Sequence, residues 1–177
     1  MIVLNAWNEM IWSFTFYFSF GLVVLLSIPV AIVRPIQVLY KGKLRGFFSL
    51  VELLVELLRL LQYGVILTYG MGFPLREVFG STFWRQVLSR LEQLQWAHVL
   101  YQFVGFAIVF AVINILLFLI ILRKSTVAVV MEKCKNKTKS FTHFDVSTVR
   151  TAAMLAVKNV FVIPVSVIYM FHILGLL

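Results

Sequence analysis

The stretch of residues 96–122, WAHVLYQFVGFAIVFAVINILLFLIIL, decides the fold class of this chain. It contains no Asp, Glu, Lys or Arg, and its strongly polar side chains are Gln102 and Asn114. Because a helix needs roughly 20 apolar residues to cross the hydrocarbon core of a bilayer, the stretch predicts a transmembrane helix. The whole chain of 177 residues is 62% hydrophobic and 13% charged, with a mean hydropathy of +0.98. Since soluble domains are about one-quarter charged, this composition predicts an integral membrane protein.

Three further apolar stretches predict membrane helices, at about 11–33, 47–71 and 151–174. We therefore expect an all-α bundle of about four transmembrane helices that forms a single domain over residues 1–177. The more polar residues 75–95 separate the second stretch from the third. Their apolar positions recur every three or four residues, which predicts a short amphipathic helix lying on the membrane surface. These positions are Phe79, Phe83, Val87, Leu91 and Leu94.

The basic residues flank the apolar stretches and predict an orientation. The chain has 16 Lys and Arg against 7 Asp and Glu. Linker 34–46 carries four basic residues and no acid, and linker 123–150 carries seven basic residues and two acids. Positive-inside bias places both linkers in the cytoplasm and both chain ends on the other side. The host membrane stays open. We expect no nucleic-acid partner, because the charge is explained by topology.

The second linker also offers candidate contacts for anionic lipid headgroups or for a partner. They are Arg123, Lys124, Lys133, Lys135, Lys137 and Lys139.

Charged residues inside the second stretch form the candidate polar cluster of the membrane region. Glu52, Glu56 and Arg59 follow one another at four and three residues, so they share one helix face. Charges at membrane depth face a bundle interior or water, which allows an ion or proton path. The alternative is that these side chains pair for packing near the cytoplasmic interface. Lys158 and Asn159 fall near the start of the fourth stretch, where we expect a lysine that snorkels from a helix end.

No catalytic or metal-binding pattern is found in the sequence. Cys134 is the only cysteine, and His98, His143 and His172 do not have the spacing of metal ligands. The chain has neither a glycine-rich phosphate loop nor a His-Glu-x-x-His motif. We therefore expect no enzymatic activity, no cofactor and no metal.

Two segments resemble the polycystin family, a branch of the TRP-like cation channels. Residues 45–52 (RGFFSLVE) resemble that family's entry into its third helix. Residues 91–96 (LEQLQW), 101–105 (YQFVG) and 107–110 (AIVF) resemble the stretch that leads into its fourth helix, and residues 9–12 (EMIW) the start of its second. The resemblance implies helices two to four of a voltage-sensor-like bundle. However, residues 96–122 lack the regularly spaced arginines of a voltage sensor, and no pore filter is evident near 161–177.

Three functions follow from these patterns and remain open. The first is a polycystin-like, channel-associated module that binds or regulates pore-forming subunits. The second is a small accessory or assembly subunit with a structural role in a larger membrane complex. The third is a small transporter or homo-oligomeric pore that uses the face with Glu52, Glu56 and Arg59. In each case we expect the lipid bilayer and other membrane subunits as partners, and an oligomeric protein.

Overall fold

The structure is a computed structural model that describes residues 2–40, 45–121, 123–137 and 144–177; for residues 45–48, 120–121 and 134–137 it describes the backbone alone. All described elements are helices. They are α1 (Ile2–Ser19), α2 (Gly21–Leu39), α3 (Arg45–Gly70), the 3₁₀ turn η1 (Leu75–Phe79), α4 (Ser81–Glu92), α5 (Trp96–Leu116), the π-helical η2 (Leu117–Ile121), α6 (Lys124–Lys137), α7 (Val146–Val157), the π-helical η4 (Lys158–Val162) and α8 (Ile163–Ile173). The expected all-α fold is confirmed.

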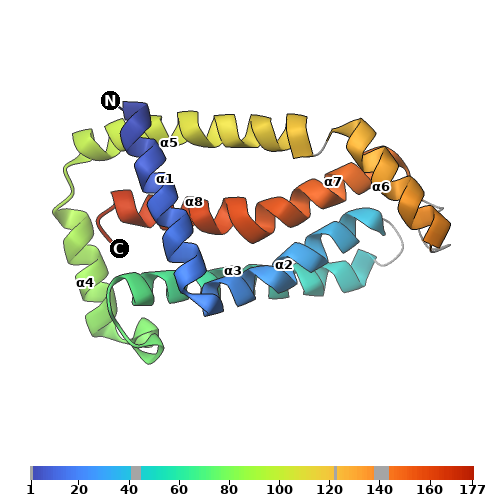
Figure 1. The fold of residues 1–177 in the computed structure, drawn as a ribbon. Helices are drawn as coiled ribbons and strands as arrows, with labels where there is room; N and C mark the ends of the chain where they lie inside the picture. The colour runs from blue at the N-terminus through green and yellow to red at the C-terminus, as the bar shows by residue number, and fades with distance from the viewer. Residues whose placement is uncertain (1, 41–44, 122, 138–143) are drawn as a thin grey trace.

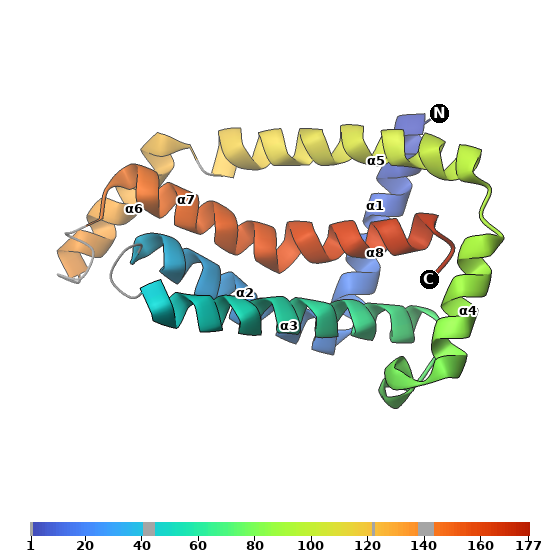
Figure 2. The ribbon, with the colours of Figure 1, turned by 180° about the vertical axis from the view of Figure 1, so that it is seen from behind.

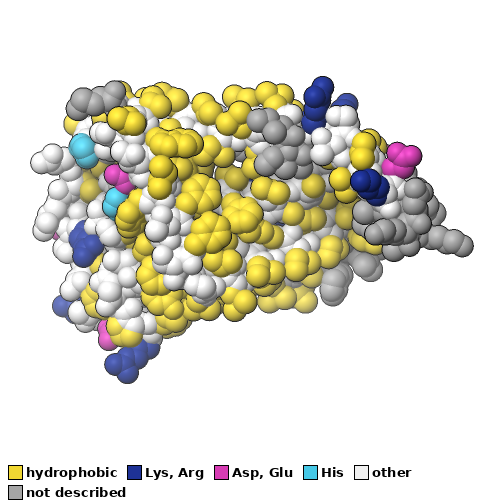
Figure 3. Space-filling view, viewed as in Figure 1, with side chains coloured by type: hydrophobic (Ala, Val, Ile, Leu, Met, Phe, Trp, Pro, Cys, Tyr) yellow, Lys and Arg dark blue, Asp and Glu magenta, His cyan; other side chains and the backbone are white. Residues whose placement is uncertain are grey.

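The long helices run roughly parallel to one another. Helices α2, α3 and α5 and the continuous run α7–η4–α8 lie side by side, while α1 crosses them obliquely (Figures 1 and 2). Helix α4 lies across one end of this bundle and α6 lies at the other. On the face shown in Figure 3, charged side chains gather at these two ends and the middle is apolar. This is the distribution that a bilayer requires of a spanning bundle.

Three helices of the described chain are long and apolar enough to cross a membrane: Gly21–Leu39, Trp96–Leu119 and Val146–Ile173. Their mean hydropathies are 2.2, 2.5 and 1.9. The chain is therefore a multi-pass membrane protein by the length and composition of its helices. The stretch expected at 47–71 does form a helix, α3, but it is not among these three. A fourth spanning helix is not shown.

The prediction of a single helix at about 11–33 is wrong. The backbone of Phe20 is extended, with φ −112° and ψ 90°, and it separates α1 from α2. A new helix starts at once, because the amides of Val23 and Val24 both donate to the Phe20 carbonyl. The buried side of α1 packs on α5 and α8, which requires a direction different from that of α2. Ser19 and Gly21 flank Phe20, but the run is apolar on both sides of them, so hydropathy alone merges the two helices.

The fourth predicted helix begins five residues earlier than expected, at Val146. Asp145 caps it by accepting hydrogen bonds from the amides of Ser147 and Thr148. The hydroxyl of Ser147 also donates to this carboxylate, and that side-chain hydrogen bond foremost, followed by those from Thr148, lowers the pKa of Asp145 to about 2. Lys158 consequently lies 12 residues inside a continuous helix. The prediction that it lies near the start of the helix is therefore wrong. Linker 123–150 contains the helix α6.

The amphipathic helix expected within residues 75–95 is α4. Its Phe83 and Val87 are buried against Leu67 of α3 and Leu176 near the C-terminus. Phe79 departs from the expected apolar face, because it belongs to η1 and is 89% exposed. Helix α4 thus closes the end of the bundle, where Arg90 also donates to the carbonyl of Gly175 at 3.1 Å.

Helix α1 approaches α5 most closely at Gly105. A Cβ atom built on Gly105 would lie 2.9 Å from the Cβ of Ala6 and 3.1 Å from Cγ2 of Ile2. Small residues at such crossings allow two backbones to approach each other in a membrane. The absence of a side chain at position 105 therefore permits α1 to lie across the bundle.

Enlarging this glycine tests the crossing. We expect Gly105→Leu to lower the free energy of unfolding by about 1–3 kcal/mol, the usual cost of overpacking. The measurement is denaturant-induced unfolding in mild detergent, followed by tryptophan fluorescence. Gly21→Ala is the control, because nothing lies within 4 Å of its added Cβ atom. An equally stable Gly105→Leu protein would contradict the observed packing of α1.

Candidate functional site: a charged cluster within the bundle

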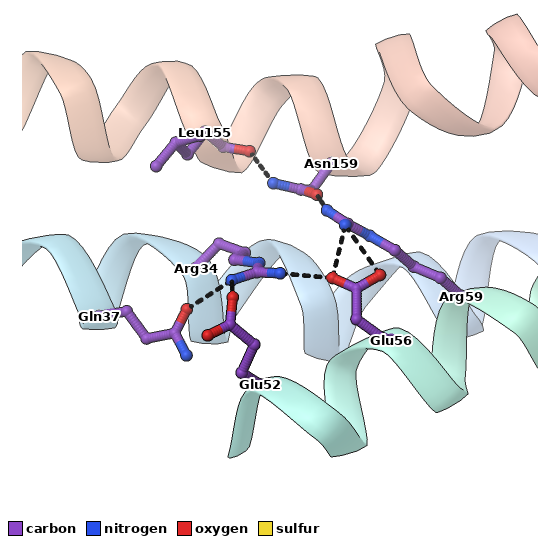
Figure 4. Close-up of polar contacts among 7 residues, drawn as sticks. All are labelled: Arg34, Gln37, Glu52, Glu56, Arg59, Leu155 and Asn159. Atoms are coloured by element: carbon purple, nitrogen blue, oxygen red, sulfur yellow. Dashed lines mark hydrogen bonds and ion pairs between the residues drawn. The ribbon is translucent and has the colours of Figure 1, made fainter. Parts of the chain in front are cut away.

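The three charged residues predicted on one face of α3 meet a fourth, Arg34, from α2. Arg34 Nη1 donates to Glu52 Oε1 at 2.8 Å, and its Nη2 donates to Glu56 Oε1 at 2.5 Å (Figure 4). The same guanidinium also donates to Gln37 Oε1 at 3.1 Å. Sequence analysis assigned Arg34 to the linker, whereas the structure places it in α2 before Pro35. Arg34 therefore fastens α2 to α3.

Arg59 extends the network to a third helix. Its Nη1 donates to both carboxylate oxygens of Glu56, at 3.0 and 3.3 Å. Its Nη2 donates to Asn159 Oδ1 at 2.5 Å, and Asn159 in turn donates to the carbonyl of Leu155 at 2.7 Å (Figure 4). We call Arg34, Glu52, Glu56, Arg59 and Asn159 the charged cluster. With two arginines and two glutamates, its formal charge sums to zero.

The cluster reaches the middle of the bundle. Asn159 lies 13 residues beyond Val146 and 14 residues before Ile173, the ends of the continuous helix. At about 1.5 Å per residue, this position is roughly 20 Å from either end. An arginine that binds Asn159 therefore lies near the middle of the longest candidate span. Pairing inside the bundle is the arrangement that a bilayer demands of such a residue.

A second set of polar side chains, which are uncharged and buried, lies next to the charged cluster. Gln62 Nε2 donates to Ser27 Oγ at 2.6 Å and to the carbonyl of Val23 at 2.8 Å, which ties α3 to α2. Tyr17 Oη of α1 lies 3.2 Å from Ser27 Oγ and donates to the carbonyl of Val160 at 2.6 Å. Gln62, Ser27 and Tyr17 are each at most 2% exposed. Four separate helical segments therefore meet at one set of hydrogen bonds.

Pro164 explains why Tyr17 is needed there. A proline has no amide hydrogen, so the carbonyl four residues earlier, that of Val160, loses its helical donor. The segment around it is π-helical, and the amide of Ile163 donates to the carbonyl of Lys158. Proline is tolerated within a membrane helix when another group satisfies the freed carbonyl. Tyr17 supplies that group from the crossing helix α1.

Sequence analysis missed a polar pocket at the end of the bundle near α4. Glu9 Oε2 lies 2.5 Å from His172 Nδ1, and the imidazole stacks on Trp12 with 3.9 Å between ring centroids. The pocket also includes His98 and Gln102 of α5. The sequence feature that could have indicated this pocket is Glu9, a charged residue next to an apolar run. Its partner was not predictable, because Glu9 and His172 lie at opposite ends of the chain.

The basic residues of the second linker are only partly described. Arg123, Lys124 and Lys133 are exposed at the end of the bundle that holds α6. Lys135 and Lys137 belong to the backbone of α6, but their side chains lie outside the described part of the structure, as does the whole of Lys139. Of the three whose side chains are described, Arg123, Lys124 and Lys133, the structure therefore brings none into the charged cluster.

Comparison with protein-family models, with characterised proteins and with solved structures finds no match to this chain.

A double-mutant cycle tests the contact at the centre of the bundle. We expect Arg59→Met and Asn159→Leu to be coupled by about 1 kcal/mol in the free energy of unfolding, because each removes one side of the same hydrogen bond. Arg85→Met on α4 is the control, and we expect its effect to add to that of Asn159→Leu. Additive effects of Arg59→Met and Asn159→Leu would contradict the contact.

A second cycle tests the interaction of Tyr17 with the freed carbonyl. We expect Tyr17→Phe to destabilise the protein by about 1–3 kcal/mol, because a buried carbonyl loses its donor. In a Pro164→Ala background the loss is smaller, since the new amide can donate to Val160. Tyr101→Phe serves as control, because Tyr101 is 41% exposed. The hypothesis fails if the cost of Tyr17→Phe is the same with proline and with alanine at position 164.

Proposed function

We propose that this protein is an accessory subunit of a membrane complex, and that it binds a neighbouring membrane protein through the outer face of α3. The observation that carries this proposal is a pair of half-exposed carboxylates beside a ridge of exposed leucines. Accessory function and channel association were two of the interpretations of the sequence, and this face is compatible with both.

The leucine ridge of α3 consists of Leu50, Leu53, Leu54, Leu57, Leu60 and Leu61, each 48–64% exposed. Positions 50, 53, 57 and 60 are separated by three, four and three residues. This alternation is the heptad spacing of helices that pack side by side with left-handed crossing. The ridge alone would suit lipid equally well, so the choice between lipid and protein rests on its neighbours.

Glu52 and Glu56 lie at the edge of the ridge. Their side chains are 59% and 47% exposed, whereas Arg34, which binds both, is 19% exposed. An exposed carboxylate on a membrane helix is costly, and such residues normally face another helix or water. A neighbouring helix with apolar residues opposite the leucines and a lysine or arginine opposite Glu56 would complement this face. The proposed partner is therefore a membrane protein with a basic residue in a spanning helix.

The ion pairs of the charged cluster favour a structural role, in which they hold helices together, over a role as a transport path. Each of its two arginines and two glutamates is bound to an opposite charge within the chain. A path for ions needs groups that exchange partners, and these already hold three segments together. A transporter or homo-oligomeric pore remains the outcome that the experiment below must separate from accessory function.

The same proposal includes the membrane topology. Helix α3 packs against α2 and runs in nearly the same line as the other long helices, so we propose that it is a fourth spanning helix (Figure 2). The C-terminal end of α2, the start of α3 and α6 lie at one end of the bundle, where Tyr40 meets Phe144 edge to face with centroids 5.7 Å apart. Positive-inside bias makes this end cytoplasmic. The resemblance to polycystins makes a cation-channel subunit the first partner to test.

The test uses the full chain, purified in mild detergent and examined by native mass spectrometry. We expect a stoichiometric complex with a multi-pass membrane protein. Combining Leu53→Ala and Leu57→Ala, or Glu52→Gln and Glu56→Gln, is expected to weaken it about tenfold or more, as for other residues central to an interface. Leu100→Ala with Leu116→Ala on α5 is the matched control, because these leucines are similarly exposed, at 64% and 48%.

Two outcomes would overturn the proposal. One is a protein that carries lipid alone, or a partner that α3 variants retain as well as the α5 control does. The other is ion or solute flux through liposomes that contain only this protein and lose flux with Glu56→Gln, which would establish the transporter. If the partner is a channel, co-expression is expected to change its current, while this protein alone gives none.

A further inference from the structure

A groove opens between α5–η2 and α7, on a different side of the bundle from the leucine ridge. It has a volume of about 390 Å³, within the range of roughly 300–1,000 Å³ that is usual for ligand pockets. Its apolar walls include Ile115, Leu117, Phe118 and Met154. Such walls offer an elongated apolar ligand the same surroundings as lipid.

Lys158 gives the groove a charge. It lines the groove near the midpoint of the helix Val146–Ile173, yet within the described chain it forms no ion pair. The carboxylates of Glu52 and Glu56 are already bound to arginines. An ammonium at this depth therefore lacks the anion that membrane helices normally provide.

Arg150 brings a second cation to the mouth of the same groove. Its guanidinium lies 3.9 Å from the centroid of the Phe118 ring, which is part of the groove wall. Arg150 precedes Lys158 by eight residues, so it lies about 12 Å nearer to the N-terminal end of the same continuous helix, on the side of α6.

We propose that this groove binds one anionic phospholipid, with an acyl chain along the walls and its phosphate between Lys158 and Arg150. A neutral lipid would fill the apolar part but would leave Lys158 without an anion. Basic pockets between spanning helices on the cytoplasmic side are the usual sites for acidic headgroups. The site is independent of the proposed partner-binding face, because none of its residues belongs to α3.

The experiment is native mass spectrometry of the full chain in mild detergent. Phosphatidylglycerol and phosphatidylcholine with identical acyl chains are added in equal amounts. We expect one phosphatidylglycerol to bind in preference to phosphatidylcholine. Combining Lys158→Gln with Arg150→Gln is expected to weaken phosphatidylglycerol about 30-fold, roughly fivefold for each cation. Lys133→Gln on α6, which removes one exposed charge outside the groove, is expected to leave the preference unchanged.

Two further variants separate the acyl and headgroup parts of the site. Met154→Trp keeps both cations but fills the groove, and we expect it to reduce the binding of both lipids. Lys158→Arg keeps the charge and is expected to retain phosphatidylglycerol, which shows that loss in the glutamine variant is not caused by misfolding. Circular dichroism and elution volume check the fold of each variant.

Three results would overturn the proposal. They are equal retention of the two lipids by the unmodified protein, an unchanged preference in the double glutamine variant, and displacement of phosphatidylglycerol by equimolar glycerophosphoglycerol, which has the headgroup without acyl chains. The last result would indicate a phosphate site in place of a lipid site. Retention of the protein partner by the double glutamine variant keeps this test separate from that of the proposed accessory function.

Discussion

The pairing of Arg59 is the interaction on which the arrangement of the spanning helices depends. Hydrocarbon offers no water to a guanidinium about 20 Å from either end of a helix, so the chain itself must provide every partner. Glu56 accepts from Nη1 of Arg59 and Asn159 accepts from its Nη2, while Nε has no hydrogen-bond partner within the described chain; Arg34 binds the same Glu56 from the other side. One network therefore sets the relative depth of α2, α3 and the α7–η4–α8 run. Sliding any of these helices by a turn would separate a charge from its partner.

The same constraint accounts for the unusual course of α1. A proline in the middle of the last spanning helix leaves the carbonyl of Val160 without its helical donor, and the hydroxyl of Tyr17 replaces that donor. This requires α1 to leave the direction of α2 at Phe20 and to cross the bundle, and Gly105 permits the close approach on the opposite side. A local defect in one helix is thus satisfied by the orientation of another.

The charges of the bundle differ in how completely they are satisfied. Glu52 and Glu56 are bound to arginines within the charged cluster, although their side chains are half-exposed beside the leucine ridge of α3. Lys158, in the groove between α5–η2 and α7, forms no ion pair within the described chain. In our two proposals a basic helix covers the first place and an acidic lipid the second, on separate faces of the bundle.

Hydropathy and helical spacing were sufficient to predict the all-α class, the bounds of α3 and of the continuous helix α5–η2 within about two residues, and the shared face of Glu52, Glu56 and Arg59. These features depend on residues close together in the chain. The bend at Phe20 was decided by tertiary packing, because both sides of it are equally apolar. Contacts of Arg34 with Glu56, of Arg59 with Asn159 and of Glu9 with His172 join positions 22 to 163 residues apart. Periodicity within one helix carries no information about which neighbouring helix will supply the partner.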